Sequence, residues 1–306
     1  MEYKMRILQL FNWKISDIIE ANILPIIKEQ GFDAIQINPL QPLKEDGYQN
    51  WWLSYQPCDF KIGNQYGVKQ DLINLCQTAA FYNIDVFPDI IVTHMAEKEK
   101  FIPHDKVNPI YKDNPYVWRE RKNINNWENR YEITHYCPGN LPALNLQNYD
   151  LLNDIIRFLN DYIDCGVKGF RIDSAKSIGL PEEGCDFFTK ITQDLKQKNL
   201  FLYGEVIFAS DELVKMYSKY IKVLTGSWPN TNPNDVVIFA ESHDSYLDNH
   251  MYYTRRLTDR EVANEYGIIT ERYPNTLFYT RPYSNEWKDF VVRNANEKNK
   301  YKRYTY

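Results

Sequence analysis

The sequence lacks the features of a membrane, redox or nucleic-acid-binding protein. It contains no run of about 18 apolar residues, so no segment is expected to span a membrane. Its five cysteines are widely spaced and form no Cys-x-x-Cys pair, which argues against a disulfide scaffold or zinc ribbon and favours reduced thiols. The 36 basic and 41 acidic residues give a net charge of −5 without a long Lys/Arg block. Nucleic acid and membrane surfaces are therefore not expected partners.

Two further absences concern targeting and nucleotides. The N-terminal apolar stretch Ile7–Phe11 is short and is interrupted by Gln9, so no signal peptide is recognised. A cytoplasmic location is expected, whereas a chain that had lost its leader would be secreted. No Gly-x-Gly-x-x-Gly or Gly-x-x-x-x-Gly-Lys-Ser/Thr motif follows an apolar run, which removes the main support for nucleotide binding.

What the sequence has in excess is aromatic side chains, at 15 % of its residues, including 24 Tyr and 7 Trp. A hydrophobic core accounts for part of this excess, and rings in a cleft that stack on flat apolar ligand faces would account for more. The length of 306 residues allows one barrel-sized domain or two ordinary ones.

Apolar runs alternate with stretches of helical period along the chain. The runs predict strands at Arg6–Leu10, Phe32–Ile37, Ile84–Val92, Gly169–Ile172, Leu200–Tyr203, Ile221–Leu224, Val236–Ala240 and Thr276–Thr280. The periodic stretches predict helices at Ile15–Gln30, Leu72–Tyr82, Leu151–Cys165, Phe187–Gln197, Glu212–Tyr220, Asp259–Tyr266 and Trp287–Asn294. This order predicts an α/β protein with a closed (β/α)₈ TIM barrel. Two connections, 38–68 and 94–149, are long enough to build a cleft, the second as a small excursion after strand 3.

Polar residues stand where the predicted strands end, which in such barrels is where the reacting groups lie. Strand 3 ends in Asp89 and His94, strand 4 in Arg171 and Asp173, strand 5 in Glu205, and strand 7 in Glu241, His243 and Asp244. Arg171 and Asp173 share one face of their strand, so the cation is expected to keep the carboxylate ionised. Glu205 follows an apolar strand, where desolvation should raise its pKa. One ionised and one protonated carboxyl group are what glycosidic cleavage requires.

These residues belong to a set of ordered motifs. DIIVTH (89–94), GFRIDSAK (169–176), YGEV (203–206) and ESHDS (241–245) occur in the order of the four signature regions of the α-amylase family, glycoside hydrolase family 13. LPALN (141–145) resembles the fifth motif of that family, and WWLSYQP (51–57) resembles the segment that frames its cleft. The resemblance covers roughly residues 6–285.

The resemblance implies roles for individual residues. Asp173 matches the nucleophile, Glu205 the general acid/base, and Asp244 the third carboxylate. The other matches are in the substrate cleft: Tyr55, His94, Arg171, His243 and Lys176, with Trp51, Trp52, Gln56 and Ile207 nearby. Lys176 matches a lysine on the leaving-group side. Of the adjacent tryptophans, one is expected to stack on sugar, with Trp52 favoured, and the other to pack inside.

Other polar residues receive structural interpretations. Asp89 is expected to brace the end of strand 3 near Arg171, and Glu241 to be buried or at the rim without a chemical role. His104, His135 and His250 have no motif support and are expected in loops or at the surface.

The sequence departs from the family at its calcium site. The ligand positions that the resemblance implies are occupied by Thr93, Ala143 and Ser177, so the family's calcium site is expected to be lost and no cofactor is predicted. Asp105, Asn108 and Asn140 are the residues from which a site would have to be rebuilt. A chloride site near Arg171 and Arg281 remains open, although Ser242 replaces the asparagine that the family uses there.

The expected organisation is a barrel formed by residues 1–93 and 150–306, an excursion at 94–149, and no C-terminal β-sandwich domain. The resemblance implies a retaining hydrolase of α-1,4-linked glucans or maltooligosaccharides. The alternatives are a transglycosylase or an α-1,6- or sucrose-acting enzyme of the same family, a non-catalytic glucan-binding protein, and a phosphate-binding barrel enzyme. The sequence lacks the glycine-rich loop after strand 7 or 8 that a phosphate-binding barrel enzyme would need. The sequence gives no oligomeric state.

Overall fold

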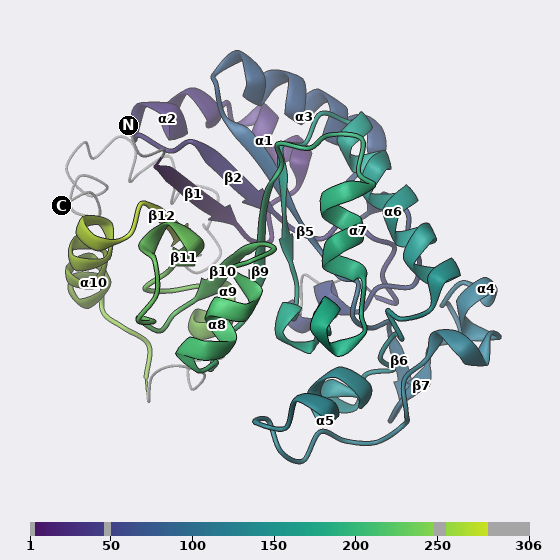
Figure 1. The fold of residues 1–306 in the computed structure, drawn as a ribbon. Helices are drawn as coiled ribbons and strands as arrows, with labels where there is room; N and C mark the ends of the chain where they lie inside the picture. The colour runs from purple at the N-terminus through teal and green to yellow at the C-terminus, as the bar shows by residue number, and fades with distance from the viewer. Residues whose placement is uncertain (1–3, 46–49, 248–254, 281–306) are drawn as a thin grey trace.

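The computed structural model of the chain describes residues 4–45, 50–247 and 255–280 (Figure 1). In this part of the chain, eight parallel strands close into a barrel in the order β1-β12-β11-β10-β9-β8-β5-β2. They are β1 (Met5–Leu10), β2 (Ala34–Ile37), β5 (Asp85–Ile90), β8 (Gly169–Ile172), β9 (Phe201–Glu205), β10 (Lys222–Thr225), β11 (Val236–Ile238) and β12 (Asn275–Tyr279). The predicted (β/α)₈ barrel is therefore confirmed.

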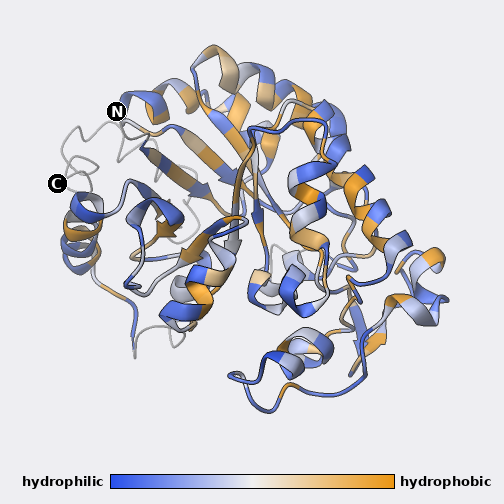
Figure 2. Ribbon diagram, in the orientation of Figure 1, coloured by the Kyte–Doolittle hydropathy of each residue, from blue (hydrophilic) through white to orange (hydrophobic). Residues whose placement is uncertain are grey.

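Helices lie around the outside of the barrel (Figure 1). They are α1 (Ile15–Glu20), α2 (Leu24–Glu29), α3 (Lys69–Phe81), α6 (Tyr149–Asp164), α7 (Phe187–Gln193), α8 (Asp211–Tyr217), α9 (His243–Leu247) and α10 (Asp259–Arg272). Figure 2 shows hydrophobic and hydrophilic residues alternating along them, as expected for helices that pack one face on a sheet. Among the residues described, no helix is long and apolar enough to cross a membrane.

One predicted helix is wrong. The stretch Ile15–Gln30 forms two helices, α1 and α2, because the chain turns at Asn22, which has a left-handed φ of 48°. Pro25 stands in the first turn of α2, where its missing N–H is tolerated. Inside one continuous helix the same proline would remove a hydrogen bond and clash with the preceding turn. The predicted helix Trp287–Asn294 lies outside the described residues.

The barrel is filled by side chains from its strands. Met5, Ile7, Phe87, Tyr203 and Leu224 belong to one buried cluster, and a second, larger cluster contains the packed faces of the helices. Gly169 is required at the start of β8, because a Cβ there would lie 2.2 Å from the carbonyl oxygen of Phe201. The packed interior leaves the ends of the strands as the place for a site.

Two long connections lie beyond the carboxyl ends of the strands. The first contains the 3₁₀ helix η1 (Trp51–Tyr55) and a small hairpin of β3 (Gly63–Asn64) and β4 (Gly67–Val68). The second, between β5 and α6, contains β6 (Glu97–Glu99), β7 (Ile102–Pro103), α4 (Pro109–Lys112) and α5 (Arg130–His135), and it projects from one end of the barrel (Figure 1). We call residues 94–149 the excursion. Isolated β-bridges join His94 to Ala143 and Trp118 to Leu144, so its beginning, middle and end are tied together.

The remaining 3₁₀ turns are short. They are η2 (Pro115–Val117), η3 (Pro138–Asn140), η4 (Ala175–Ser177), η5 (Pro181–Glu183) and η6 (Pro233–Asp235). Of these, η4 matters for the site because it begins two residues after Asp173.

Candidate active site

The Arg171 guanidinium is the centre of a carboxylate cluster at the carboxyl ends of β5, β8 and β9. Its Nη1 lies 2.9 and 2.8 Å from the two oxygens of Asp89 and 2.7 Å from Oδ1 of Asp173. Its Nη2 lies 2.8 Å from Oε1 of Glu205. Arg171 and Asp89 face each other in the register of β5 and β8, which explains why the expected contact between them is present. One cation thus holds three carboxylates from three adjacent strands.

Exposure separates the carboxylates of this region by role. The side chains of Asp173, Glu205 and Asp244 keep 11 %, 14 % and 12 % of their surface exposed, whereas that of Asp89 keeps 1 %. A ligand that approaches from solvent can therefore reach the first three but not Asp89, whose contacts are those of a brace.

Burial controls the protonation of the cluster. It raises the pKa of Asp173 to about 7 and that of Glu205 to about 7, although Arg171 lowers both, and the neighbouring carboxylates raise them further. Burial also raises the pKa of Asp89, to about 6. For Glu205 this is the predicted direction. For Asp173 the prediction that Arg171 alone keeps the pKa low is wrong, because one cation shared among three buried carboxylates does not offset their desolvation.

Ser174 fixes the orientation of Glu205. It follows Asp173 with a left-handed φ of 48°, and its backbone N–H donates to Oε2 of Glu205 at 3.0 Å. A non-glycine residue in this conformation costs free energy, and such strain collects at functional sites. The turn after Asp173 therefore links the two carboxylates through the backbone as well as through Arg171.

A second network holds His243 beside the cluster. The side-chain amide of Gln9 lies 2.8 Å from Nδ1 of His243, and Nε2 of His243 lies 2.7 Å from the hydroxyl of Tyr55. The Tyr55 hydroxyl donates to Asp89 at 2.8 Å. Because the amide nitrogen of Gln9 only donates, Nδ1 accepts and the ring proton belongs on Nε2. That proton faces Tyr55 and also Asp244, 3.1 Å away.

Asp244 differs electrostatically from the other two cleft-facing carboxylates. Burial pushes its pKa upward, but the interaction with His243, together with the charge of Arg171, outweighs burial and holds the pKa below its usual value. The pKa of Asp244 thus favours its ionised form, whereas the pKa values of Asp173 and Glu205 lie near neutrality.

His94 is buried at the start of the excursion. Its Nδ1 lies 2.9 Å from the Thr93 hydroxyl and its Nε2 lies 2.9 Å from the carbonyl oxygen of Tyr55. Burial, assisted by the charge of Arg119, lowers its pKa to about 4, so the imidazole is neutral at neutral pH. The Gln56 side chain points to the excursion instead, where its oxygen accepts from the N–H of Glu97 at 2.9 Å.

The two adjacent tryptophans have different surroundings. The ring of Trp51 lies edge-on to Tyr55 and His243, at centroid distances of 6.2 and 5.7 Å, within a partly buried aromatic cluster. Trp52 is 45 % exposed, with the Lys44 ammonium 5.9 Å from its ring centre. Trp51 is therefore the tryptophan that contacts the site, and sugar stacking by Trp52 stays a prediction. Ile207 is half-buried against the barrel interior.

A groove lies beside Lys176. It is lined by Trp127 and Glu128 of the excursion, by Lys176, and by Phe208 and other residues up to Met216. Trp127 is 50 % and Phe208 62 % exposed, and Lys176 donates to the Phe208 carbonyl at 3.0 Å. Two exposed aromatic side chains thus line the same groove as Lys176.

The remaining predicted residues lie away from this cluster. Glu241 is buried, His104 accepts from the N–H of Lys106 in a loop, and His135 ends α5 with its ring stacked on Tyr131. His250 and Arg281 lie outside the described residues, so the chloride site stays a prediction.

The positions that correspond to the family's calcium ligands do not fit a metal. The Thr93 hydroxyl bonds to His94, Ala143 offers no side-chain oxygen, and the carbonyl of Ser177 accepts from Arg119. Asp105 pairs with Lys98, and the Asn108 side chain caps α4, while Asn140 is exposed. Within the described ranges, no three His, Cys, Asp or Glu side chains gather as a metal site would require.

Three residues of this region were not found from the sequence. Gln9 gave a signal, since it is a polar residue inside an otherwise apolar strand and it is buried. Ser174 gave none, because its left-handed backbone is unusual for serine. Arg119 lies in a loop without regular pattern, where burial of a cation cannot be read from neighbouring residues.

The fold and the cluster together define a (β/α)₈-barrel protein whose strand ends present a cation-bound carboxylate site. The family model described as alpha amylase, catalytic domain, matches residues 18–288. The chain therefore belongs to the alpha-amylase family.

Individual relatives agree with this assignment. An alpha-amylase of Clostridium acetobutylicum is 29 % identical over an alignment that covers 95 % of this chain and 42 % of that protein. The chain thus spans less than half the length of this relative. Among solved structures, wild-type alpha-amylase I from Eisenia fetida superposes with a TM-score of 0.76 at 18 % identity, covering 92 % of this chain and 69 % of that one. An alpha-amylase from Geobacillus thermoleovorans complexed with acarbose gives 0.73 at 16 % identity, covering 99 % and 79 %.

Proposed function

We propose that this chain hydrolyses α-1,4-glucosidic bonds in starch-like glucans or maltooligosaccharides with retention of anomeric configuration. The observation that carries the proposal is the sharing of Arg171 by Asp173 and Glu205, which places two cleft-facing carboxyl groups side by side on adjacent strands. Closely spaced carboxyl groups suit a double displacement, whereas wide spacing leaves room for an attacking water. The acarbose complex of the Geobacillus relative supports a sugar-like ligand.

The proposed reaction has two steps. Glu205 donates its proton to the glycosidic oxygen while Asp173 attacks the anomeric carbon, so the leaving sugar departs as an alcohol and a glycosyl-Asp173 ester forms. Glu205, now ionised, removes a proton from water, which attacks the same carbon and releases Asp173. Asp244, His243 and Arg171 surround the positive charge that develops on the sugar ring. The ionised state of Asp244 is suited to that task.

The direct test is the product series from soluble starch. Proton NMR of the first products should show the α-anomer before mutarotation, together with maltooligosaccharides that shorten over time. A first product of β configuration would contradict retention. Incubation with maltoheptaose, isomaltose and sucrose separates the alternatives, since a transglycosylase would lengthen maltoheptaose and an α-1,6- or sucrose-acting enzyme would consume the other sugars. If none of these sugars yields reducing ends, the protein binds glucans without catalysing their hydrolysis.

The pH dependence follows from the two raised pKa values. Below them both Asp173 and Glu205 are protonated and the nucleophile is lost; above them both are ionised and the proton donor is lost. We therefore expect kcat/KM to follow a bell-shaped curve with its maximum near neutral pH. The profile of the Glu205→Gln variant, measured with a glycosyl fluoride, should lack the alkaline limb. An unchanged alkaline limb in that variant would assign it to another group.

The groove beside Lys176 should bind the leaving-group part of long substrates. Trp127→Ala and Phe208→Ala each remove an exposed ring from it, so we expect KM for long maltooligosaccharides to rise roughly tenfold, or about 1.4 kcal/mol, with little change for short ones. Steady-state kinetics over a series of chain lengths tests this. Tyr116→Ala is the matched control, since Tyr116 is a 77 % exposed ring of the excursion that does not line the groove. Equal KM values for both groove variants and the control would exclude this use of the groove.

A further inference from the structure

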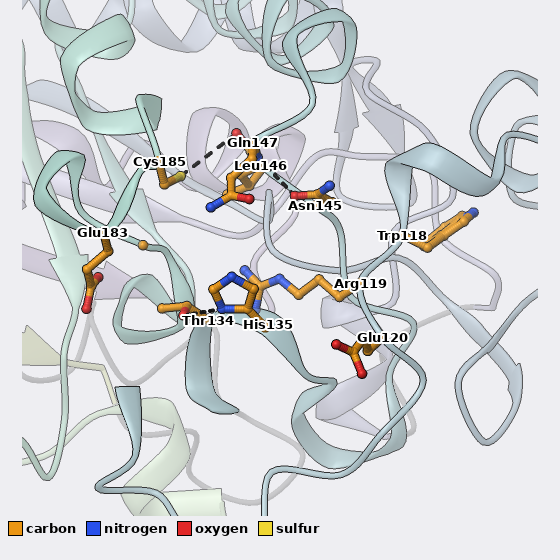
Figure 3. A pocket seen from close by; sticks show the side chains of 11 residues that line it. Trp118, Arg119, Glu120, Thr134, His135, Asn145, Leu146, Gln147, Glu183 and Cys185 are labelled. Atoms are coloured by element: carbon orange, nitrogen blue, oxygen red, sulfur yellow. Dashed lines mark hydrogen bonds between the residues drawn. The ribbon is translucent and has the colours of Figure 1, made fainter. Parts of the chain in front are cut away.

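Arg119 is a buried cation in the excursion that is held by backbone oxygens. The residue is 8 % exposed, and its guanidinium donates to four carbonyls: Leu144 at 2.9 Å, Ile133 at 3.2 Å, Tyr136 at 3.5 Å and Ser177 at 2.8 Å. In the part of the chain that the structure describes, no carboxylate forms an ion pair with it. Figure 3 shows its side chain extending from the segment between Trp118 and Glu120 toward Thr134 and His135.

A ring of carbonyl oxygens around one positive charge is the environment that proteins also offer to calcium. Desolvating a guanidinium is costly, and burial lowers the pKa of Arg119 to about 10, still well above neutrality. Hydrogen bonds from a charged donor are about twice as strong as neutral ones, so four such bonds offset much of this cost. The side chain therefore stays charged in its cage of acceptors.

This cage lies at the three positions that the sequence resemblance assigns to calcium ligands, Thr93, Ala143 and Ser177. The Ser177 carbonyl, which is at one of the family's ligand positions, accepts from Nη2 of Arg119. The backbone N–H of Arg119 donates to Ala143, at a second ligand position, at 2.9 Å. Leu144, the next residue in the chain, accepts a hydrogen bond from Nε of Arg119. Its own N–H donates at 2.8 Å to the carbonyl of Thr93, which is the third ligand position. All three positions thus lie around one arginine.

We propose that the guanidinium of Arg119 takes the place of the calcium ion, so that a cation belonging to the chain itself joins the excursion to the loop after β8. Ser177 closes the 3₁₀ turn η4 directly after Lys176, and the excursion holds this turn a second time through Arg130. Arg130 donates to the carbonyls of Lys176 at 2.8 Å and Ile178 at 3.4 Å, and it pairs with Glu183. Arg119 is in this sense a positioning residue for the loop that carries Lys176.

The first test needs only the unaltered protein. Its Tm, measured by differential scanning fluorimetry, should be the same in excess EDTA and in excess CaCl₂, and calorimetric titration with Ca²⁺ should give no saturable heat. A Tm that falls in EDTA and returns with Ca²⁺ alone would overturn the proposal.

The second test alters the cation. Arg119→Met leaves four carbonyls without their donor, so its Tm should fall by roughly 10 °C and not recover with Ca²⁺, because Ala143 supplies no carboxylate. Arg119→Lys keeps the charge but not the fork of donors, so its Tm should lie between the two, and it serves as the comparison where Arg119→Met does not fold. Arg121→Met, a change at an exposed arginine two residues along, is the matched control.

Hydrogen exchange separates a positioning role from general destabilisation. In Arg119→Lys, the amides of Ser177 and Ile178, which close the turn onto Ser174 and Ala175, should exchange faster while those of α10 keep their native rates. Equal acceleration in both regions, or native exchange at 174–178 together with a native Tm, would overturn the proposal.

Discussion

Replacing Asp173 by Asn should reduce kcat on starch by on the order of 10⁴-fold while the protein remains folded. The substitution keeps the shape of the side chain but removes the charge that attacks the anomeric carbon in the proposed mechanism. Arg171 retains Asp89 and Glu205 as partners, so no buried cation is left alone. Reducing-end assays measure the turnover, and circular dichroism with a melting curve checks the fold.

Covalent trapping gives this prediction its residue-level readout. A fluorinated glycosyl fluoride should label the unaltered protein on the peptide that contains Asp173, and the Asp173→Asn variant should remain unlabelled. Asp85→Asn is the matched control, since Asp85 lies at the opposite end of β5, where barrel residues serve stability. Near-full activity of Asp173→Asn, or a label on another carboxylate, would assign the nucleophile elsewhere.

Replacing Glu205 by Gln should produce a loss that depends on the leaving group. Hydrolysis of starch needs a proton on the departing oxygen, so its kcat/KM should fall by about 10²–10⁴-fold. Fluoride departs without that proton, so the first step on maltosyl fluoride should be largely preserved. Water activation also needs the carboxylate, so the glycosyl-Asp173 ester should accumulate and appear as a mass increase of the intact protein.

Glu271→Gln, a change at an exposed glutamate of α10, is the control for this experiment. Equal losses on starch and on the fluoride would show that Glu205 positions the substrate and does not transfer the proton. Loss of the fold would appear in the melting curve and would be visible independently of either substrate.

The barrel could be predicted from the sequence because its strands are apolar on both faces and recur between stretches of helical period. The prediction that failed was one continuous helix over Ile15–Gln30. The break between α1 and α2 was missed because the apolar spacing continues through Pro25. Helix α9 was not predicted because it spans five residues, beginning with His243 and Asp244, too few to show a period.

The carboxylates of the site could also be expected, since strand ends in a barrel bring distant residues to one edge. The pKa shifts of these carboxylates could not be predicted from the sequence. The sequence predicts Asp173 and Asp89 beside Arg171 but does not reveal that Glu205 shares the same cation. Burial of the three carboxylates then raises the pKa of Asp173, which reverses the expected direction. The Gln9–His243 contact joins residues 234 positions apart, which no local pattern reveals.

The attachment of the excursion has a consequence for how this protein can change over evolutionary time. Arg119 and Arg130 donate hydrogen bonds to three consecutive backbone carbonyl oxygens, those of residues 176, 177 and 178. Every amino acid supplies that acceptor, so mutations at these positions leave the anchor intact. The side chains that line the groove beside Lys176 can therefore change while the two arginines keep the loop in place.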